Sequence, residues 1–123
     1  MFQRRISTAL KDWSENPNRK PLILRGARQV GKTTAVSMLA EQFDQYIYLN
    51  LELKADRDLF KQDYTAPELF EAICFLNNKD PQKHRTLLFI DEIQSSPEAV
   101  AVLRYFYEEL PHIYVVAAGS LLE

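Results

Sequence analysis

The sequence predicts a three-layer α/β fold with a mainly parallel sheet, because four short apolar runs alternate along the chain with segments of helical periodicity. Strands that alternate with helices favour a parallel sheet with helices packed on both faces. The chain of 123 residues is long enough for one compact domain of this kind. Its hydrophobic content of 46% and charged content of 26% are ordinary for a globular protein.

The first half of the chain is expected to hold two helices and two strands. An amphipathic N-terminal helix begins at about Phe2, because apolar residues recur there at helical spacing, and the turn-forming residues 16–18 end it. Residues 22–24 form a short apolar run that leads to a glycine, a pattern typical of a buried strand before a tight turn. A helix with an apolar inner face is expected over residues 33–43, and the aromatic and aliphatic residues 46–49 indicate a second strand.

The second half is expected to hold two more helices and two more strands. Residues 52–62 are polar and mixed in character, so no element is assigned to them. A Thr-x-x-Glu capping box opens a helix over about residues 65–77. The run 87–90 is apolar on both faces, as in a central parallel strand, a helix with proline in its first turn follows over residues 97–110, and residues 113–118 supply the fourth strand. The expected buried stripe of this last helix comprises Val100, Leu103 and Phe106 or Tyr107.

A phosphate-binding loop is predicted between the first strand and the second helix. Residues 26–33 read Gly-Ala-Arg-Gln-Val-Gly-Lys-Thr and match the pattern G-x-x-x-x-G-K-[ST] in full. The two glycines let the backbone wrap a polyphosphate with its N–H groups pointing inward. Lys32 then reaches the terminal phosphates and the Thr33 hydroxyl ligates Mg²⁺, while the next helix adds the positive end of its dipole. The expected nucleotide-binding residues are Gly26, Ala27, Arg28, Gln29, Val30, Gly31, Lys32, Thr33 and Thr34.

Two of these residues have an alternative interpretation in which they do not contact the nucleotide. Arg28 occupies a free position of the motif, so it contacts the nucleotide or a neighbouring subunit, or it is a solvated side chain. Thr34 follows the motif, and it either hydrogen-bonds an inner phosphate or only belongs to the first helical turn.

Two acidic residues follow the third strand directly. Asp91 at the carboxyl end of that strand is expected near Mg²⁺, held through a water molecule. Glu92 beside it is the expected general base for an attacking water molecule. Two solvated, inert acids at the end of a strand are the alternative. The preceding phosphate loop and the alternating α/β pattern favour the catalytic interpretation.

Other polar residues are expected at the same edge of the sheet, because ligands of open parallel sheets bind beyond the carboxyl ends of the strands. Ser120 follows the fourth strand, and it either hydrogen-bonds the γ-phosphate or the attacking water molecule, or starts a turn. Asn50 ends the second strand, and it either holds Glu92 in an unproductive position until a partner binds, or caps backbone groups at the strand end.

Composition excludes several classes of protein. The formal net charge of −2 is too small to indicate wholesale binding to nucleic acid, although residues 1–32 are basic and favour either an anion site or a solvated helix. No apolar run is long enough to span a membrane, and the start of the chain lacks the apolar stretch of a secretory signal. Cys74 is the single cysteine, so no internal disulfide forms and a cytoplasmic location is expected. His84 and His112 lie without a cluster of metal-ligating residues around them in the sequence.

Taken together, the motifs resemble those of a family of prokaryotic AAA+ superfamily ATPases. The resemblance is carried by residues 24–33, 89–94 and 117–122, with a further similar stretch at residues 103–108, and it covers nearly the whole chain. It implies a P-loop nucleoside-triphosphatase core that binds ATP with Mg²⁺ and hydrolyses the γ-phosphate. By resemblance, the Walker A residues are Lys32 and Thr33, the Walker B pair is Asp91 and Glu92, and the sensor-1 position is Ser120.

The resemblance also implies parts that this sequence does not contain. Members of the family continue into a fifth core strand, a helical segment and a nuclease-like C-terminal domain, so the chain is expected to be truncated after the sensor-1 strand. The first strand is then expected at an exposed sheet edge. Residues 1–20 are expected as a helix and linker packed on the core, and residues 21–123 as a partial AAA+ ATPase domain.

Several functions remain open at this stage. ATP binding with hydrolysis is the first expectation, and hydrolysis is expected to be weak here because no residue matches an arginine finger. A nucleotide-dependent switch or partner-binding module with little or no hydrolysis is the alternative. A small-molecule kinase and an inert remnant are further alternatives. The expected partners are ATP and a protein, or a second copy engaged through the missing C-terminal parts; nothing in the sequence supports nucleic acid, and no membrane is expected.

Overall fold

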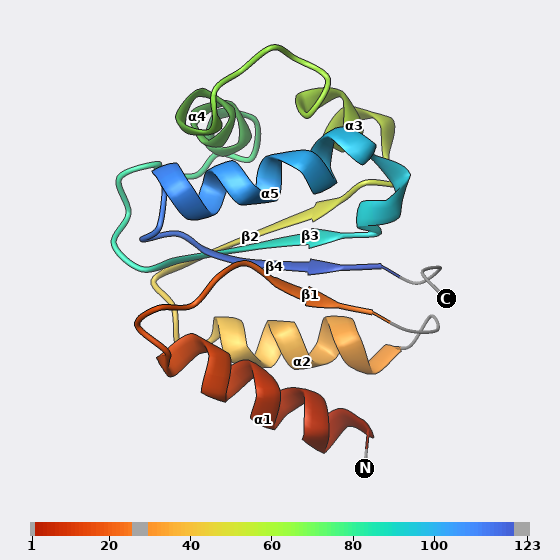
Figure 1. Cartoon of the computed structure of the whole chain (residues 1–123), viewed down its shortest axis with the longest axis vertical. Coiled ribbons are helices and arrows are strands. Elements are labelled where there is room, and N and C mark those ends of the chain that lie inside the picture. The colour runs from red at the N-terminus through yellow and green to blue at the C-terminus, as the bar shows by residue number, and fades with distance from the viewer. Residues whose placement is uncertain (1, 26–29, 120–123) are drawn as a thin grey trace.

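The computed structural model describes residues 2–25 and 30–119 of the chain (Figure 1). Helices and strands alternate along most of this range, as the sequence predicts. In chain order the elements are α1 (Phe2–Glu15), β1 (Leu22–Leu24), α2 (Val30–Ala40), β2 (Gln45–Asn50), α3 (Lys54–Leu59), α4 (Ala66–Leu76), β3 (Thr86–Asp91), the short 3₁₀ helix η1 (Ile93–Ser95), α5 (Pro97–Glu109) and β4 (Tyr114–Ala118).

The four strands form one parallel sheet in the order β1-β4-β3-β2, which confirms the predicted fold class. The central strand β3 is buried from Thr86 to Ile90, so both of its faces are covered. Among the described residues, β1 pairs only with β4, and this confirms the first strand at the edge of the sheet. Because every strand runs the same way, all four carboxyl ends meet at one edge (Figure 1).

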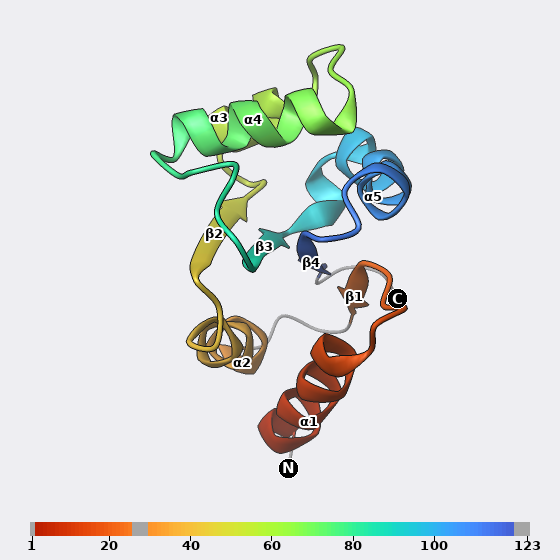
Figure 2. The same cartoon turned by 90° about the vertical axis from the view of Figure 1, so that its left-hand side faces the viewer.

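Helices cover both faces of the sheet and make the three layers (Figures 1 and 2). Helices α1 and α2 pack on one face, where Leu87 and Phe89 of β3 are buried. Helices α3, α4 and α5 lie over the other face, where Leu88 and Ile90 are buried. Successive residues of β3 therefore serve opposite cores, because side chains alternate along a strand.

Helix α2 differs from the expected range at both ends. It begins at Val30, three residues before the expected start, and it ends at Ala40. The three residues that follow bond to carbonyls three positions earlier, with Phe43 N donating to Ala40 O at 3.0 Å. Bonds of this spacing tighten the last turn, so the periodic apolar pattern continues to Phe43 although the α-helix has ended.

The expected buried stripe of α5 was right for Leu103 and Phe106 and wrong for Val100, and the sequence analysis assigned no element where α3 lies. Val100 is 48% exposed, whereas Ala99 is fully buried beside the expected Leu103 and Phe106. The small Ala99 packs in the core, so only the first member of the stripe differs from the expectation. Residues 54–59, within the unassigned segment, form α3, which buries Leu59.

The capping box at the start of α4 is present as predicted. Thr65 N donates to Glu68 Oε1 at 2.9 Å, and Glu68 N donates to Thr65 Oγ1 at 3.2 Å. These bonds satisfy two N–H groups at the helix start. We expect Thr65→Ala to lower the free energy of unfolding by about 1 kcal/mol, because one of these bonds is lost. Thr65→Ser keeps the hydroxyl and should stay within a few tenths of the wild-type value in urea unfolding; equal losses in both variants would contradict the capping role.

The single cysteine belongs to the core. Cys74 on α4 is fully buried, and burial, followed by the nearby acidic residues Asp80 and Glu71, raises the pKa of its thiol to about 11. A thiol held protonated in this way is a poor nucleophile. In the part of the chain that the structure describes, no helix has both the length and the apolar character needed to cross a bilayer.

Candidate nucleotide site at the carboxyl edge of the sheet

The carboxyl edge of the sheet gathers most of the residues that the sequence singled out. Strands β2 and β3 end side by side, with Asn50 paired in register to Asp91. Strand β1 ends at Leu24, paired with Ala118 of β4, and α2 starts at the same end of the molecule (Figure 1). The expected site residues Gly26, Ala27, Arg28, Gln29 and Ser120 lie outside the described residues.

Lys32 reaches across the sheet edge from the first turn of α2. Its Nζ donates to the carbonyl oxygen of Gly119 at 3.1 Å, and the residue is only 6% exposed. Gly119 N in turn donates to Leu24 O at 3.0 Å, which ties the end of β4 to the end of β1. The lysine ammonium is therefore held between two strand ends, directly before the position of Ser120 in the chain.

Thr33 and Thr34 follow Lys32 in the first turn of α2, and both are exposed. A helix start carries N–H groups without helical partners and the positive end of the helix dipole, which together favour an anion. The two hydroxyl groups are thus available to a ligand that binds at this helix start.

Asp91 lies at the end of β3 with both carboxylate oxygens engaged. Its Oδ2 accepts a hydrogen bond from Tyr48 Oη at 2.7 Å, and its Oδ1 accepts one from Glu92 N at 2.9 Å. Tyr48 is paired in register with Phe89, two residues before Asp91, so all three lie on the sheet face that α2 covers. Asp91 and Lys32 therefore approach the edge from the same side of the sheet.

Tyr48 is a site residue that the sequence analysis missed. Burial raises the pKa of its hydroxyl above the usual value, and the hydrogen bond to Asp91 and the negative charges of Asp91 and Glu92 raise it further. The only feature of the sequence that could have identified Tyr48 as a site residue was its position two residues before Asn50 on the same strand. That position points at Asp91 only once the register of β2 against β3 is known.

We expect the Tyr48 hydroxyl to make stability depend on pH in the alkaline range. Its pKa is raised in the folded protein, so the unfolded chain loses this proton first as the pH rises above about 10, and the free energy of unfolding then falls. Tyr48→Phe lacks the proton, so its stability should fall less steeply from about pH 9 to about pH 11 in urea unfolding. Parallel curves for the two proteins would contradict the assignment.

Glu92 adopts an unusual backbone conformation. Its φ of 55° and ψ of 48° lie in the left-handed region, which costs a non-glycine residue of order 1–3 kcal/mol. Its Oε1 accepts a hydrogen bond from Gln94 Nε2 at 2.8 Å. Strained backbone of this kind is concentrated at functional sites, so the conformation favours a role beyond packing for Glu92.

Asn50 contacts backbone at the end of β2 and does not bond to Glu92. Its Oδ1 accepts from Glu52 N at 3.0 Å, and its own N donates to Asp56 Oδ2 at 2.9 Å. The structure thus matches the second of the two alternatives, in which Asn50 caps the strand end. Gln94, to which the sequence analysis gave no role, donates a hydrogen bond to the Glu92 carboxylate.

The residues present fit Mg²⁺ through their oxygen atoms. The Thr33 hydroxyl is exposed, and the Asp91 carboxylate has acceptor capacity beyond its two hydrogen bonds. The described residues contain no group of three or more His, Cys, Asp or Glu side chains arranged to hold a metal ion. Mg²⁺ at nucleotide sites usually needs only one or two protein oxygens, because phosphates and water complete its coordination.

Comparison with known proteins places this arrangement in a family. The fold is similar to that of PCH-2 from C. elegans, with a TM-score of 0.53 and 16% sequence identity. The match covers 98% of this chain and 35% of the PCH-2 chain, so this chain spans about a third of that protein. No relative was found among curated protein sequences. A family model described as an AAA domain matches residues 18–123, and the chain therefore belongs to the AAA domain family of nucleotide-binding proteins.

Proposed function

We propose that this protein binds ATP with Mg²⁺ at the carboxyl edge of its sheet and hydrolyses the γ-phosphate. The observation that carries the proposal is the meeting of Lys32 and the Asp91–Glu92 pair at one edge, where Lys32 Nζ contacts the end of β4 and Asp91 ends β3. The phosphate-loop motif leads into the same edge. Membership of the AAA domain family supports nucleotide binding.

Binding rests on residues 26–34. In this proposal the loop amides and the start of α2 cradle the phosphates, and Lys32 turns from the Gly119 carbonyl to the terminal phosphates. Thr33 and Asp91 hold Mg²⁺, Asp91 through a water molecule. The ion, when bound, neutralises charge that develops on the phosphate oxygens.

Hydrolysis rests on Glu92, which orients the attacking water molecule and accepts its proton. Its carboxylate accepts a hydrogen bond from Gln94. This bond must break before Glu92 can turn toward the attacking water molecule. Ser120 hydrogen-bonds the γ-phosphate or the water molecule. An arginine finger from outside these residues is expected in the complete protein, because such a residue contributes about 10³- to 10⁵-fold in rate.

The proposal is tested by following thermal unfolding while ATP or GTP is added with and without Mg²⁺. A ligand that binds only the folded protein raises the unfolding temperature with concentration, by mass action. We expect an upward shift with Mg·ATP, a smaller shift with ATP alone, and little or none with GTP. Identical shifts with all four additions, or none at all, would contradict a specific ATP site.

A nucleotide-dependent switch is the second candidate. It is favoured by the hydrogen bond from Gln94 to Glu92, because a carboxylate that accepts this bond must be released from it before it can act as a general base. Here bound ATP alters the contact with a partner, and hydrolysis is slow or incidental. Turnover that a protein partner stimulates would favour the ATPase, whereas partner binding that depends on ATP without any turnover would favour the switch.

Further parts of the proposal concern the whole protein. Residues 1–20 act as an N-terminal helix and linker, and residues 21–123 as the ATPase domain. The prokaryotic source, the nuclease-like C-terminal domain, the cytoplasmic location and a protein or self-association partner remain predictions from the resemblance and the composition. Expression of a longer parent protein, followed by gel filtration with and without ATP, tests the self-association.

A further inference from the structure

A basic cavity lies at the amino edge of the sheet, opposite the proposed nucleotide site. The segments that precede β1, β3 and β4 lie together at that end of the molecule (Figure 1). They line a cavity of about 320 Å³ that is open to solvent on one side. Its chemistry is set by Arg19, Lys83, His84, Arg85, His112 and Tyr114. These residues come from three distant parts of the sequence, and no residue that lines the cavity in the described part of the chain is acidic.

Two arginines share one aromatic ring in this cavity. The Cζ atom of Arg19 lies 3.3 Å from the centroid of the Tyr114 ring, and that of Arg85 lies 5.1 Å from it. Arg85 also donates from Nη1 to Tyr114 Oη at 3.1 Å and from Nε to Gln42 O at 3.1 Å. Burial lowers the pKa of Arg19; Tyr114 opposes this effect, and the positive charge of Arg85 adds to it. The two guanidinium groups are thus close enough to repel one another.

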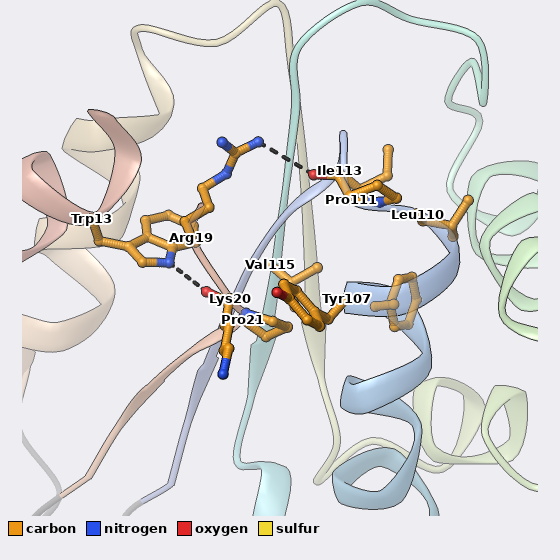
Figure 3. Close-up of a pocket in the computed structure, with 10 residues that line it drawn as sticks. Trp13, Arg19, Lys20, Pro21, Tyr107, Leu110, Pro111, Ile113 and Val115 are labelled. Carbon is orange, nitrogen blue, oxygen red and sulfur yellow. Dashed lines mark hydrogen bonds between the residues drawn. The ribbon is translucent and has the colours of Figure 1, made fainter. Parts of the chain in front are cut away.

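The backbone holds these cations in place. Arg85 has a φ of 61°, in the left-handed region that costs a residue with a side chain of order 1–3 kcal/mol. Arg19 stretches from the linker before β1 to the carbonyl of Pro111 after α5 (Figure 3). That contact and the one to Asn16 O are both long, at 3.4 Å. Strain and like charge are therefore concentrated at one place.

The cavity presents donors that other described residues do not satisfy. Arg19 Nε is buried and has no hydrogen-bond acceptor, so an anion would reach it only if the guanidinium turned toward the cavity. Lys83, His84 and His112 are exposed, and within the described ranges no carboxylate pairs with any of the five basic side chains. Buried donors and clustered cations are normally compensated by acceptors or counter-charges. An anion that enters the cavity would supply the missing counter-charge to the exposed cations.

We propose that this basic cavity binds a phosphate group carried by a small anion, independently of the nucleotide site. Guanidinium groups match phosphate oxygens by paired hydrogen bonds, and several donors converge here on one space. The volume is at the lower end of the roughly 300–1,000 Å³ found for small-molecule pockets. Single-stranded nucleic acid fits less well, because guanidinium groups already cover the rings of Phe43 and Tyr114 on which bases would stack.

The test uses inorganic pyrophosphate as the probe, in titration calorimetry of the whole chain. Lys83→Glu reverses a charge in the cavity at an exposed side chain, so the variant should fold normally. It should weaken pyrophosphate binding by about tenfold or more, as expected for loss of a charge-assisted contact. Lys61→Glu, at an exposed lysine that does not line the cavity, is the matched control and should keep the wild-type affinity.

A background variant separates this cavity from the proposed nucleotide site. Lys32→Ala removes the lysine of the phosphate loop, and pyrophosphate binding that persists there and is lost on adding Lys83→Glu supports the cavity. Binding that disappears in Lys32→Ala and is unchanged in Lys83→Glu would overturn it, since the phosphate loop would then be the whole site. Tight binding of a single-stranded oligonucleotide with none of pyrophosphate would also overturn it, in favour of nucleic acid.

Discussion

Replacing Lys32 by alanine is expected to abolish ATP binding in the concentration range where the wild-type chain binds. The ammonium is the one charge that the phosphate-loop motif places against the terminal phosphates. A hydrogen bond to a charged group contributes about 1.5–3 kcal/mol, which corresponds to a loss of roughly ten- to a hundredfold in affinity. Binding is measured as the ATP-dependent rise in unfolding temperature or directly by calorimetry.

The Lys32→Ala experiment also needs a control, because Lys32 makes a structural contact. Its Nζ bonds to Gly119 O across the edge of the sheet, and its stem is buried, so alanine removes packing as well as charge. Lys32→Met keeps most of the buried stem and lacks the charge, so it should also lose ATP while unfolding closer to the wild-type temperature. Wild-type affinity in either variant would contradict the assigned role.

Replacing Glu92 by glutamine is expected to spare ATP binding and to remove most of the turnover. Glutamine has nearly the size of glutamate and keeps an oxygen for the hydrogen bond from Gln94, but it does not accept a proton from water. General-base catalysis contributes about 10²- to 10⁴-fold, so the rate of phosphate release should fall at least about a hundredfold. Because turnover is expected to be slow, the measurement is a single-turnover assay with excess protein and Mg·ATP.

The matched control for Glu92 is Glu109→Gln on α5. Glu109 is exposed and is the last residue of that helix, whose carboxyl end lies away from the carboxyl edge of the sheet (Figure 1). The control should release phosphate at the wild-type rate. Unchanged turnover in Glu92→Gln would exclude Glu92 as the base, and equal loss of turnover in both variants would assign the effect to stability instead of chemistry.

Much of the fold could be predicted because its determinants are local. The apolar run of β3 is buried from Thr86 to Ile90, and the capping box starts α4 where Thr65 and Glu68 predicted it. Such patterns depend on hydrogen bonds and burial within one element. The expectation for Val100 was wrong because the apolar residues of α5 fit two neighbouring stripes, and only packing on the sheet selects Ala99.

The sequence predicted the motif residues of the candidate site but not the residues that contact them. Lys32, Asp91 and Glu92 were found from spacing, because the chemistry of phosphate binding requires those residue types near strand ends. The sequence analysis gave no role to the partners Tyr48, Gly119 and Gln94, and the contacts of the first two depend on which strands are neighbours. Of the two alternatives for Asn50, the structure matches the cap at the strand end, because its Oδ1 accepts from the backbone N–H of Glu52 in the turn that follows β2.

The order of residues alone determined the four strands, the helices α1, α2, α4 and α5, the parallel class of the sheet and the phosphate-loop motif, since periodicity and turn chemistry act over a few neighbouring positions. Tertiary structure alone decided the pairing of Tyr48 with Asp91, the reach of Lys32 to Gly119, and the basic cavity that joins residues 19, 83–85 and 112. Each of these depends on strand order and register, which arise when distant segments pack together and which no local pattern encodes.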